Sequence, residues 1–417
     1  VGVGVGLGLA ADILLGITLF IPYVLDRLIY ARFFKNTIVQ MFLFAITWVC
    51  VDVIFEFTPV ANYVSLGYSQ YSILPLAQVI SLFGLHFLSF IIVLFSAGIA
   101  LYFVNFNPKK KSKNIKTIII SSSFLVFSLL YGGIYSIVPP ISNNSIIVMN
   151  GYSTNTSHSW SRRIFTLEEN INWFTNDATL AKASNVNLLT YPEESFVIDK
   201  SEENAFIDAL SKTCSENNIY AVIGIRVNQS KDTFLNQSWI IDNQGKLRSK
   251  YTKTHYVPFA EKGIIVGDGN IEVVDTPFGK LATVICMDLE YPTYISKVRR
   301  LGADILVAPS WDWSSMPKNH SRSDSFRAIE NGVNFIRVTE EGYSVSTDYR
   351  GNVISEYFTS ANYSYKVAKH IYKMPTKGIA TLYGYIAVAL PFLYPISLAT
   401  IIVTSVVINK KKTSTVK

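Results

Sequence analysis

The stretch 282-ATVICMDLEYP-292 carries the first information about the fold. Its opening residues are apolar and partly β-branched, which is typical of a buried strand. Cys286, Asp288, a glutamate and a proline come at its end, and a packed core needs none of them. In open α/β folds, reactive side chains collect where strands end and loops begin. The stretch therefore predicts an α/β domain with chemistry at Cys286.

Strand-like and helix-like runs alternate on both sides of this stretch, between residues 144 and 373. The predicted strands are 146–149, 186–191, 220–227, 237–242, 271–276, 281–286, 304–310 and 334–339. The predicted helices are 167–184, 202–216, 293–301 and 321–331. A closing hairpin is predicted at 343–358, with its turn around Gly351 and Asn352. This pattern indicates a layered α/β fold.

The composition indicates a protein that is part membrane and part aqueous domain. Hydrophobic residues make up 49% of the 417 residues and charged residues 16%. This is too apolar for an ordinary soluble enzyme and too charged for a protein buried wholly in a bilayer. Crossing a bilayer takes about 20 helical residues. Apolar runs of that length are predicted near 5–25, 37–58, 79–104, 117–138 and 378–408.

These runs divide the chain into four expected regions. They are a transmembrane helical bundle (1–140), an aqueous catalytic domain (144–373), a C-terminal transmembrane helix (376–409) and a basic tail (410–417). We expect about four spans in the bundle, from the same hydropathy argument. The protein is therefore predicted to be a multi-pass protein of the cell membrane.

Basic clusters next to the spans predict the orientation. Arg27, Arg32 and Lys35 lie after the first span, 108-PKKKSKNIK-116 after the third, and 410-KKK-412 after the last. Such clusters stay on the cytoplasmic side, so the catalytic domain is expected on the extracytoplasmic side. Much of the formal net charge of +7 lies in these clusters. It is explained by topology and contact with the bilayer, and no nucleic-acid partner is expected.

Ionisable side chains at three predicted strand ends form a chemically sufficient set. Glu193 and Glu194 follow one strand, Lys253 lies after a polar segment, and Cys286 ends another strand. A thiol attacks only as thiolate, so it needs a base and a nearby cation. A glutamate can take the proton, and a lysine can stabilise both the thiolate and a developing oxyanion. We therefore expect the pKa of Cys286 to lie below the free-thiol value of about 8.5.

Each of these residues also has a purely structural explanation that spacing does not reject. A cysteine at the end of an apolar strand is often a small buried hydrophobe, as expected for Cys50 and Cys214. A Cys214–Cys286 disulfide is disfavoured, because one residue falls in a polar helix and the other in a core strand. The five histidines show no metal-ligand spacing, so neither a metal nor a cofactor is expected. Asn-X-Ser/Thr triplets, that of Asn236 included, are attributed to compositional chance.

Three sequence blocks together carry a family resemblance. The blocks 191-YPEES-195, 250-KYTKTHYVPFAE-261 and 284-VICMDLEYP-292 resemble the three catalytic blocks of the nitrilase superfamily, in the same order. One such block is weak evidence, but three in sequence are strong. The resemblance implies a nitrilase-like αββα sandwich, here attached to an α-helical transmembrane bundle.

The resemblance also implies the roles of the site residues. Glu193 would be the general base, Lys253 the stabiliser of the transition state and Cys286 the nucleophile. A second glutamate beside the lysine often assists in this superfamily. The expected supporting residues are Glu261, Glu194 and Asp288.

The membrane spans narrow the resemblance to the apolipoprotein N-acyltransferases. Supporting stretches are 66-LGYSQ-70, 84-GLHFLSFIIVL-94, 320-HSRSDSFRAIENGVNFIRVT-339 and 382-LYGYIAV-388. The chain departs from that family where Met287 and Asp288 follow the nucleophile, since the family has Tyr-Glu there. The loops 310-SWDWS-314 and 340-EEG-342 also depart from it. These differences concern the acyl donor and acceptor more than the triad.

The implied reaction has two steps. Cys286 would attack an ester of a membrane phospholipid, giving a thioester, and the N-terminal amine of a diacylglyceryl-cysteine apolipoprotein would then accept the acyl chain. The alternative is a membrane-anchored nitrilase-type amidase that hydrolyses a carbon-nitrogen bond of a small substrate. A non-catalytic binding protein is disfavoured by the intact triad. The residues expected to line the substrate site are Trp160, Met287, Trp311 and Trp313.

Overall fold

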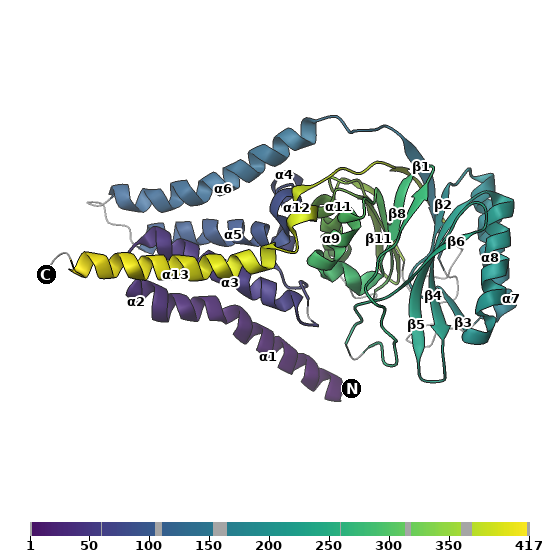
Figure 1. Cartoon of the computed structure of the whole chain (residues 1–417), viewed down its shortest axis with the longest axis horizontal. Helices are drawn as coiled ribbons and strands as arrows, with labels where there is room; N and C mark the ends of the chain where they lie inside the picture. Colours follow the sequence, from purple (N-terminus) through teal and green to yellow (C-terminus); the bar gives the residue numbers. More distant parts are fainter. Residues whose placement is uncertain are drawn as a thin grey trace. The chain divides into compact units, whose positions relative to one another are not determined.

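The computed structural model divides the chain into two compact units (Figure 1). One unit consists of Val1–Ile137 with Ile386–Lys417, and the other of Val138–Tyr385. The residues that the structure describes are 2–59, 61–104, 111–152, 165–258, 260–312, 318–359 and 369–414.

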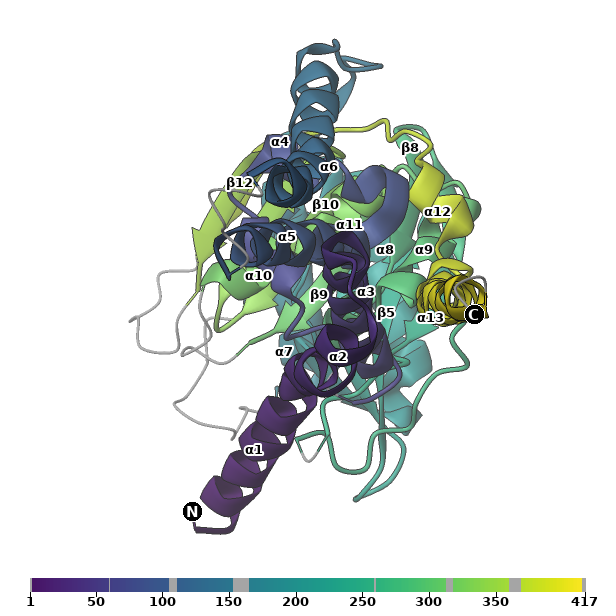
Figure 2. The same ribbon diagram turned by 90° about the vertical axis from the view of Figure 1, so that its left-hand side faces the viewer.

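The first unit is helical. Its helices are α1 (Gly2–Leu25), α2 (Ala31–Phe33), α3 (Thr37–Glu56), α4 (Leu74–Ala77), α5 (Ile80–Val104), α6 (Lys111–Ile137) and α13 (Leu390–Ser414). Figure 1 and Figure 2 show α3 beside α5, and α5 beside α6; α3 also contacts α13. Within the described residues, five helical segments are long and apolar enough to cross a membrane: Ile13–Phe33, Thr37–Glu56, Ile80–Val104, Ile115–Ile137 and Leu390–Val407.

The last span is shorter than the run predicted at 378–408. Residues Leu382–Ile386 form a separate short helix, α12, and α13 starts only at Leu390. Pro391 lies in the first turn of α13, where its missing N–H costs nothing, whereas further inside a helix it would remove a hydrogen bond. The proline therefore marks a helix start within what reads as one apolar run.

Buried polar groups join α3 to α5 inside the helical unit. His86 Nε2 lies 3.1 Å from Glu56 Oε2. Ser65 Oγ donates to Asp52 Oδ2 at 3.0 Å and lies 3.0 Å from Ser89 Oγ. Ionisable groups on membrane-spanning helices face the interior of the bundle because contact with lipid tails is costly. In these pairs, buried polar atoms gain hydrogen-bond partners that the surrounding apolar side chains cannot supply.

The second unit contains two β-sheets. The strands are β1 (Ser145–Asn150), β2 (Leu188–Thr190), β3 (Phe196–Asp199), β4 (Tyr220–Asn228), β5 (Phe234–Ile241), β6 (Leu247–Thr252), β7 (Val273–Thr276), β8 (Gly279–Thr283), β9 (Ile305–Trp311), β10 (Asn334–Glu340), β11 (Tyr343–Thr347), β12 (Val353–Phe358) and β13 (His370–Pro375). Among the described residues, one sheet has seven strands in the order β13-β1-β2-β4-β5-β6, with β3 beside β4. The other has six, in the order β12-β11-β10-β9-β8-β7.

Helices cover the outer faces of both sheets. They are α7 (Leu167–Ala183), α8 (Glu203–Asn217), α9 (Pro292–Arg300), α10 (Lys318–Asp324) and α11 (Phe326–Asn331). Side chains alternate along a strand, so Leu188 packs between the sheets while Leu189 packs under α7 and α8 with Phe174. On the other sheet, Val307 faces the sheet interface and Ala328 of α11 packs on the outer face. These four layers, visible in Figure 1, confirm the predicted αββα sandwich.

The predicted hairpin at 343–358 is present. Strands β11 and β12 are antiparallel, and Gly351 N donates to Asp348 O at 2.9 Å in the turn between them. Gly351 has φ +78°, a conformation that glycine adopts at low cost. Three strands were not predicted, namely β3, β6 and β13. The single helix predicted at 321–331 is two helices, α10 and α11, which meet at Ser325.

The prediction that a strand runs through residues 281–286 is wrong. Strand β8 ends at Thr283, and Cys286 begins a 3₁₀ helix, η5 (Cys286–Glu290), with φ +41°. Asp288 closes this turn, since its carboxylate accepts a hydrogen bond from Ile285 N at 3.0 Å. A left-handed backbone costs a non-glycine residue on the order of 1–3 kcal/mol. The chain therefore turns at the cysteine instead of ending a strand there.

Candidate active site

Glu193 lies in the loop that leaves β2, and its side chain is 4% exposed. Its backbone N–H donates to the Ser310 carbonyl at 3.3 Å, which ties the loop to the end of β9. The Oε1 atom accepts hydrogen bonds from Lys253 Nζ and Asn236 Nδ2, both at 2.7 Å. Glu193 is therefore a fixed carboxylate beside a fixed cation.

Lys253 follows β6 and is 1% exposed. Besides Glu193, its ammonium contacts Glu261 Oε1 at 2.8 Å and Oε2 at 3.0 Å. Burial lowers the pKa of Lys253, but the charges of Glu193 and Glu261 outweigh burial and raise the pKa well above its ordinary value. The ammonium consequently stays charged at any physiological pH. Glu261 is held in turn by the Val257 N–H, which donates to its Oε2 at 2.6 Å.

The Cys286 thiol donates a weak hydrogen bond to the Trp311 carbonyl, with Sγ 3.7 Å from the oxygen. The prediction that its pKa lies below that of a free thiol is wrong. Burial, and next the charge of Glu193, raise the pKa of Cys286 well above its ordinary value, against the lowering effects of Lys253 and Arg337. The sequence shows the lysine but not the extent of burial. At rest the side chain is a neutral thiol.

A cavity of about 970 Å³ opens on these side chains. Glu193, Lys253, Glu261 and Cys286 all line it, so the structure brings the predicted triad and its supporting glutamate to one place. Trp311 also lines the cavity. The arrangement offers a thiol, a proton acceptor and a cation to one bound carbonyl group.

Glu194 and Met287 differ in their relation to the cavity. Glu194 lines it, with a left-handed backbone (φ +49°) and an ion pair to Arg226 at 3.7 Å. Met287 lies in η5 and, among the described residues, is not part of the cavity lining. Two further predicted lining residues, Trp160 and Trp313, lie outside the described residues.

Asp288 is fully buried, and its carboxylate accepts hydrogen bonds from the segments that carry the site residues. It accepts hydrogen bonds from Tyr251 Oη at 2.7 Å and from both the backbone N–H and Nδ1 of His255 at 2.8 Å. It also accepts the Ile285 N–H that closes the cysteine turn. Asp288 therefore connects the segment carrying Lys253 to the turn carrying Cys286.

Asn236 is a site residue that sequence reasoning missed. It lies on β5, is fully buried, and donates from Nδ2 to Glu193 at 2.7 Å and to Glu261 Oε1 at 3.4 Å. In the folded protein its side chain cannot be a glycosylation acceptor. The polar run Asn236–Gln237–Ser238 inside an apolar strand was the available signal, because buried polar groups need partners.

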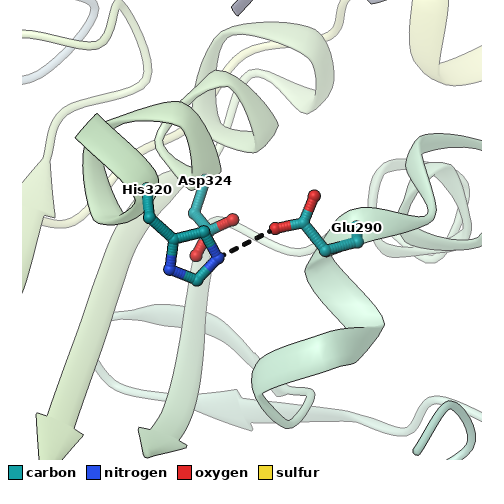
Figure 3. A group of neighbouring side chains, drawn as sticks. All are labelled: Glu290, His320 and Asp324. Atoms are coloured by element: carbon teal, nitrogen blue, oxygen red, sulfur yellow. Dashed lines mark hydrogen bonds and ion pairs between the residues drawn. The ribbon is translucent and has the colours of Figure 1, made fainter. Parts of the chain in front are cut away.

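Glu290, His320 and Asp324 form a second group whose ligand atoms lie close enough to hold a metal ion (Figure 3). His320 Nε2 lies 3.1 Å from Glu290 Oε1, the contact drawn in Figure 3. Burial lowers the pKa of His320, but Asp324 and hydrogen bonds to Asp312 and Glu290 raise it to about 10. Asp324 Oδ2 lies 2.6 Å from Arg337 Nε. A protonated imidazole and a guanidinium disfavour a cation, so this group is better described as an ion-pair network.

Comparisons with known proteins match segments of both units. Residues 158–362 match the carbon-nitrogen hydrolase family, and residues 2–98 match the apolipoprotein N-acyltransferase N-terminal domain. A solved amidase from Nesterenkonia sp. is similar to 59% of this chain and 94% of its own, with a TM-score of 0.47 and 16% identity.

Several curated relatives are apolipoprotein N-acyltransferases. The one from Geobacter metallireducens is 24% identical over 69% of this chain, which spans 60% of that relative's length. Apolipoprotein N-acyltransferase 2 of Treponema denticola is 24% identical, over 81% of this chain and 72% of its own. The Rickettsia typhi protein is 23% identical, over 91% and 80%. Over most of its length the chain is therefore similar to the apolipoprotein N-acyltransferases, and residues 158–362 match the carbon-nitrogen hydrolase family of the nitrilase superfamily.

Proposed function

We propose that this protein is a membrane N-acyltransferase of lipoprotein maturation. It moves a fatty acyl chain from a phospholipid, through a thioester on Cys286, to the N-terminal amine of a diacylglyceryl-cysteine apolipoprotein. One observation carries the proposal: Glu193, Lys253 and Cys286 line a single cavity in a chain whose described residues include five helices long and apolar enough to cross a membrane. The names of the relatives support the class of acceptor.

The first half of the reaction forms the thioester. When the ester carbonyl of the phospholipid enters the cavity, Glu193 takes the proton of Cys286 as the sulfur–carbon bond forms. The Lys253 ammonium stabilises the negative charge that develops on the carbonyl oxygen. The ester carbon–oxygen bond then breaks, Glu193 returns the proton to the leaving oxygen, and a lysophospholipid departs. A neutral resting thiol suits this sequence, because the thiolate forms only as the carbonyl is attacked.

The second half transfers the acyl chain to the acceptor. The neutral α-amine attacks the thioester carbonyl, Glu193 takes a proton from the nitrogen, and Lys253 again stabilises the oxyanion. The carbon–sulfur bond breaks, and the proton passes from Glu193 to the sulfur. The products are an amide on the apolipoprotein and the resting thiol. Splitting the transfer into two steps lowers each barrier.

The dimensions of the cavity support a lipid substrate. A volume of about 970 Å³ lies at the upper end of the roughly 300–1,000 Å³ of ligand pockets, which is more than a small amide requires. The membrane spans would keep the thiol near a bilayer.

From the basic clusters we place the catalytic unit on the extracytoplasmic side. A reporter fused near Lys111 would then be cytoplasmic and one inserted near Gly263 extracytoplasmic, and finding both on one side would refute this orientation.

Mass spectrometry of the purified chain with phospholipid tests the reaction. Incubation without acceptor should add the mass of a fatty acyl group, Cys286→Ala should abolish the adduct, and Cys214→Ala, which removes a buried thiol elsewhere, should retain it. Adding a diacylglyceryl-cysteine peptide should release the acyl group as an amide. Release by water alone, together with rapid hydrolysis of small amides, would instead establish the amidase.

A further inference from the structure

Arg337 is a fully buried cation that the reaction described above does not use. It lies on β10, and its guanidinium grips Asp312 with two hydrogen bonds, Nη1 to Oδ2 and Nη2 to Oδ1, each 2.9 Å long. Its Nε lies 2.6 Å from Asp324 Oδ2. Nη1 also donates to Ser321 Oγ at 3.0 Å and to Thr339 Oγ1 at 2.7 Å. Such a bidentate pair fixes direction as well as charge.

Burying this ion pair carries a large desolvation cost. Taking two charges out of water costs several kcal/mol for each ion, and packed apolar residues of similar volume are often as stable. Arg337 is 0% exposed and Asp312 5% exposed. A role in positioning is one reason to retain such a pair. Here the pair would position the segment that contains Asp312.

Asp312 directly follows two residues that contact the catalytic groups. The Ser310 carbonyl accepts the Glu193 N–H at 3.3 Å, and the Trp311 carbonyl accepts the Cys286 thiol at 3.7 Å. Asp312 itself is held twice, by Arg337 through its side chain and by its N–H, which donates to the Glu340 carbonyl at 3.0 Å. The consecutive residues 310–312 thus contact Glu193, Cys286 and Arg337 in turn.

We infer that Arg337 is a positioning residue for Cys286. Its two hydrogen bonds to Asp312 fix the end of β9. They thereby fix the Ser310 and Trp311 carbonyls, which accept hydrogen bonds from the Glu193 backbone and the Cys286 thiol and keep these two residues close together. The inference rests on Cys286 as the nucleophile of the proposed function. It does not depend on which carbonyl compound Cys286 attacks.

Charge alone does not explain the arrangement. The groups that act on Cys286 are Glu193 and Asp312, which raise its pKa, and Lys253 and Arg337, which lower it. Asp312 opposes Arg337, so the two charges of the pair act on the pKa of the thiol in opposite directions. The rigid fork of arginine is therefore the feature to test, and a lysine in its place keeps the charge but loses the fork.

The test compares Arg337→Lys with Arg327→Lys in the full-length chain. Arg327 is an equally buried arginine, on α11, that pairs with Glu330 at 3.1 Å. Two rates are measured for each variant: acyl-thioester formation with phospholipid, and alkylation of Cys286 by iodoacetamide between pH 6 and 10. Thermal unfolding midpoints identify any variant that is merely unfolded.

Arg337→Lys should slow thioester formation about 10–100-fold, the cost of a misplaced reacting group. The pH dependence of its alkylation rate between pH 6 and 10 should keep the shape that it has in the wild type, and Arg327→Lys should keep a thioester rate close to that of the wild type. Equal losses in both variants, or a loss in Arg337→Lys explained by its unfolding midpoint, would overturn the inference. If the wild type forms no thioester but the alkylation rate of Arg337→Lys still falls about tenfold relative to the wild type, with an unchanged pH dependence, the acyltransferase proposal fails while the positioning role stands.

Discussion

Two buried charged clusters act on the same thiol. The lysine cluster consists of Glu193, Lys253 and Glu261, and the arginine cluster of Asp312, His320, Asp324 and Arg337. Both place a cation between carboxylates at distances below 3 Å. Among the described residues, all three members of the lysine cluster line the cavity and none of the arginine cluster does.

Access to the cavity decides what the same ionic chemistry can do. The ammonium of Lys253 is a compact charge that can turn toward a new oxyanion in the cavity without breaking a rigid fork. The guanidinium of Arg337 is planar and its donors are already engaged, so it suits a fixed framework. The lysine cluster is suited to chemistry, and the arginine cluster to geometry.

Removing Lys253 disrupts the lysine cluster most directly. Lys253→Met deletes the proposed oxyanion stabiliser, which is worth on the order of 10²–10³-fold, and leaves Glu193 and Glu261 buried without this counter-ion. The rate of acyl-thioester formation should fall at least this far. Lys200→Met is the matched control, since Lys200 also lines the cavity but is exposed and pairs with Glu203. Comparable losses in the two variants would mean that the cavity, and not the lysine cluster, carries the effect.

The adjacent glutamates provide the next comparison. Glu193→Gln removes the proposed proton acceptor and should cost on the order of 10²–10⁴-fold in thioester formation. Glu194→Gln removes an ion pair with Arg226, so we expect less than about a tenfold loss, as for a partner that is not transferring the proton. Single-turnover rates with a phospholipid donor measure both. The opposite ranking would show that the base in this loop is misassigned.

The lysine cluster was predictable from sequence because its residues occur in short blocks. Glu193 follows Tyr-Pro, and Lys253 and Glu261 fall within one stretch of twelve residues. Their chemical types also match what a thiol needs. Most strands of the two sheets were predictable because they are short apolar runs rich in β-branched residues, whereas β3, β6 and β13 were not predicted.

The arginine cluster was not predictable. Its residues come from the end of β9, from α10 and from β10, and no spacing connects them. Burial is equally invisible in a sequence: it reverses the expected direction of the Cys286 pKa shift. The left-handed backbone of Cys286 also depends on Asp288, whose carboxylate closes the turn only after folding.

The smallest expected effect concerns stability and separates the clusters by pH. Asp324 and hydrogen bonds to Asp312 and Glu290 overcome burial and raise the pKa of His320 from 6.5 to about 10. Since the folded protein holds this proton more tightly than the unfolded chain, His320 contributes stability that is full below pH 6.5 and is lost as the pH rises through about 10. The thermal unfolding midpoint should fall over this interval, and less so in His320→Gln.

His370→Gln is the control for this pH dependence. Burial lowers the pKa of His370, so it is neutral throughout the same interval, and its replacement should leave the slope unchanged. The difference between the two variants isolates the arginine cluster from every other group that titrates there. If His320→Gln and the wild type lose stability in parallel from pH 7 to 10, the imidazole is neutral in the folded protein. The group of Glu290, His320 and Asp324 would then be open to a metal ion, and the contrast between a reactive and a purely structural cluster would no longer hold.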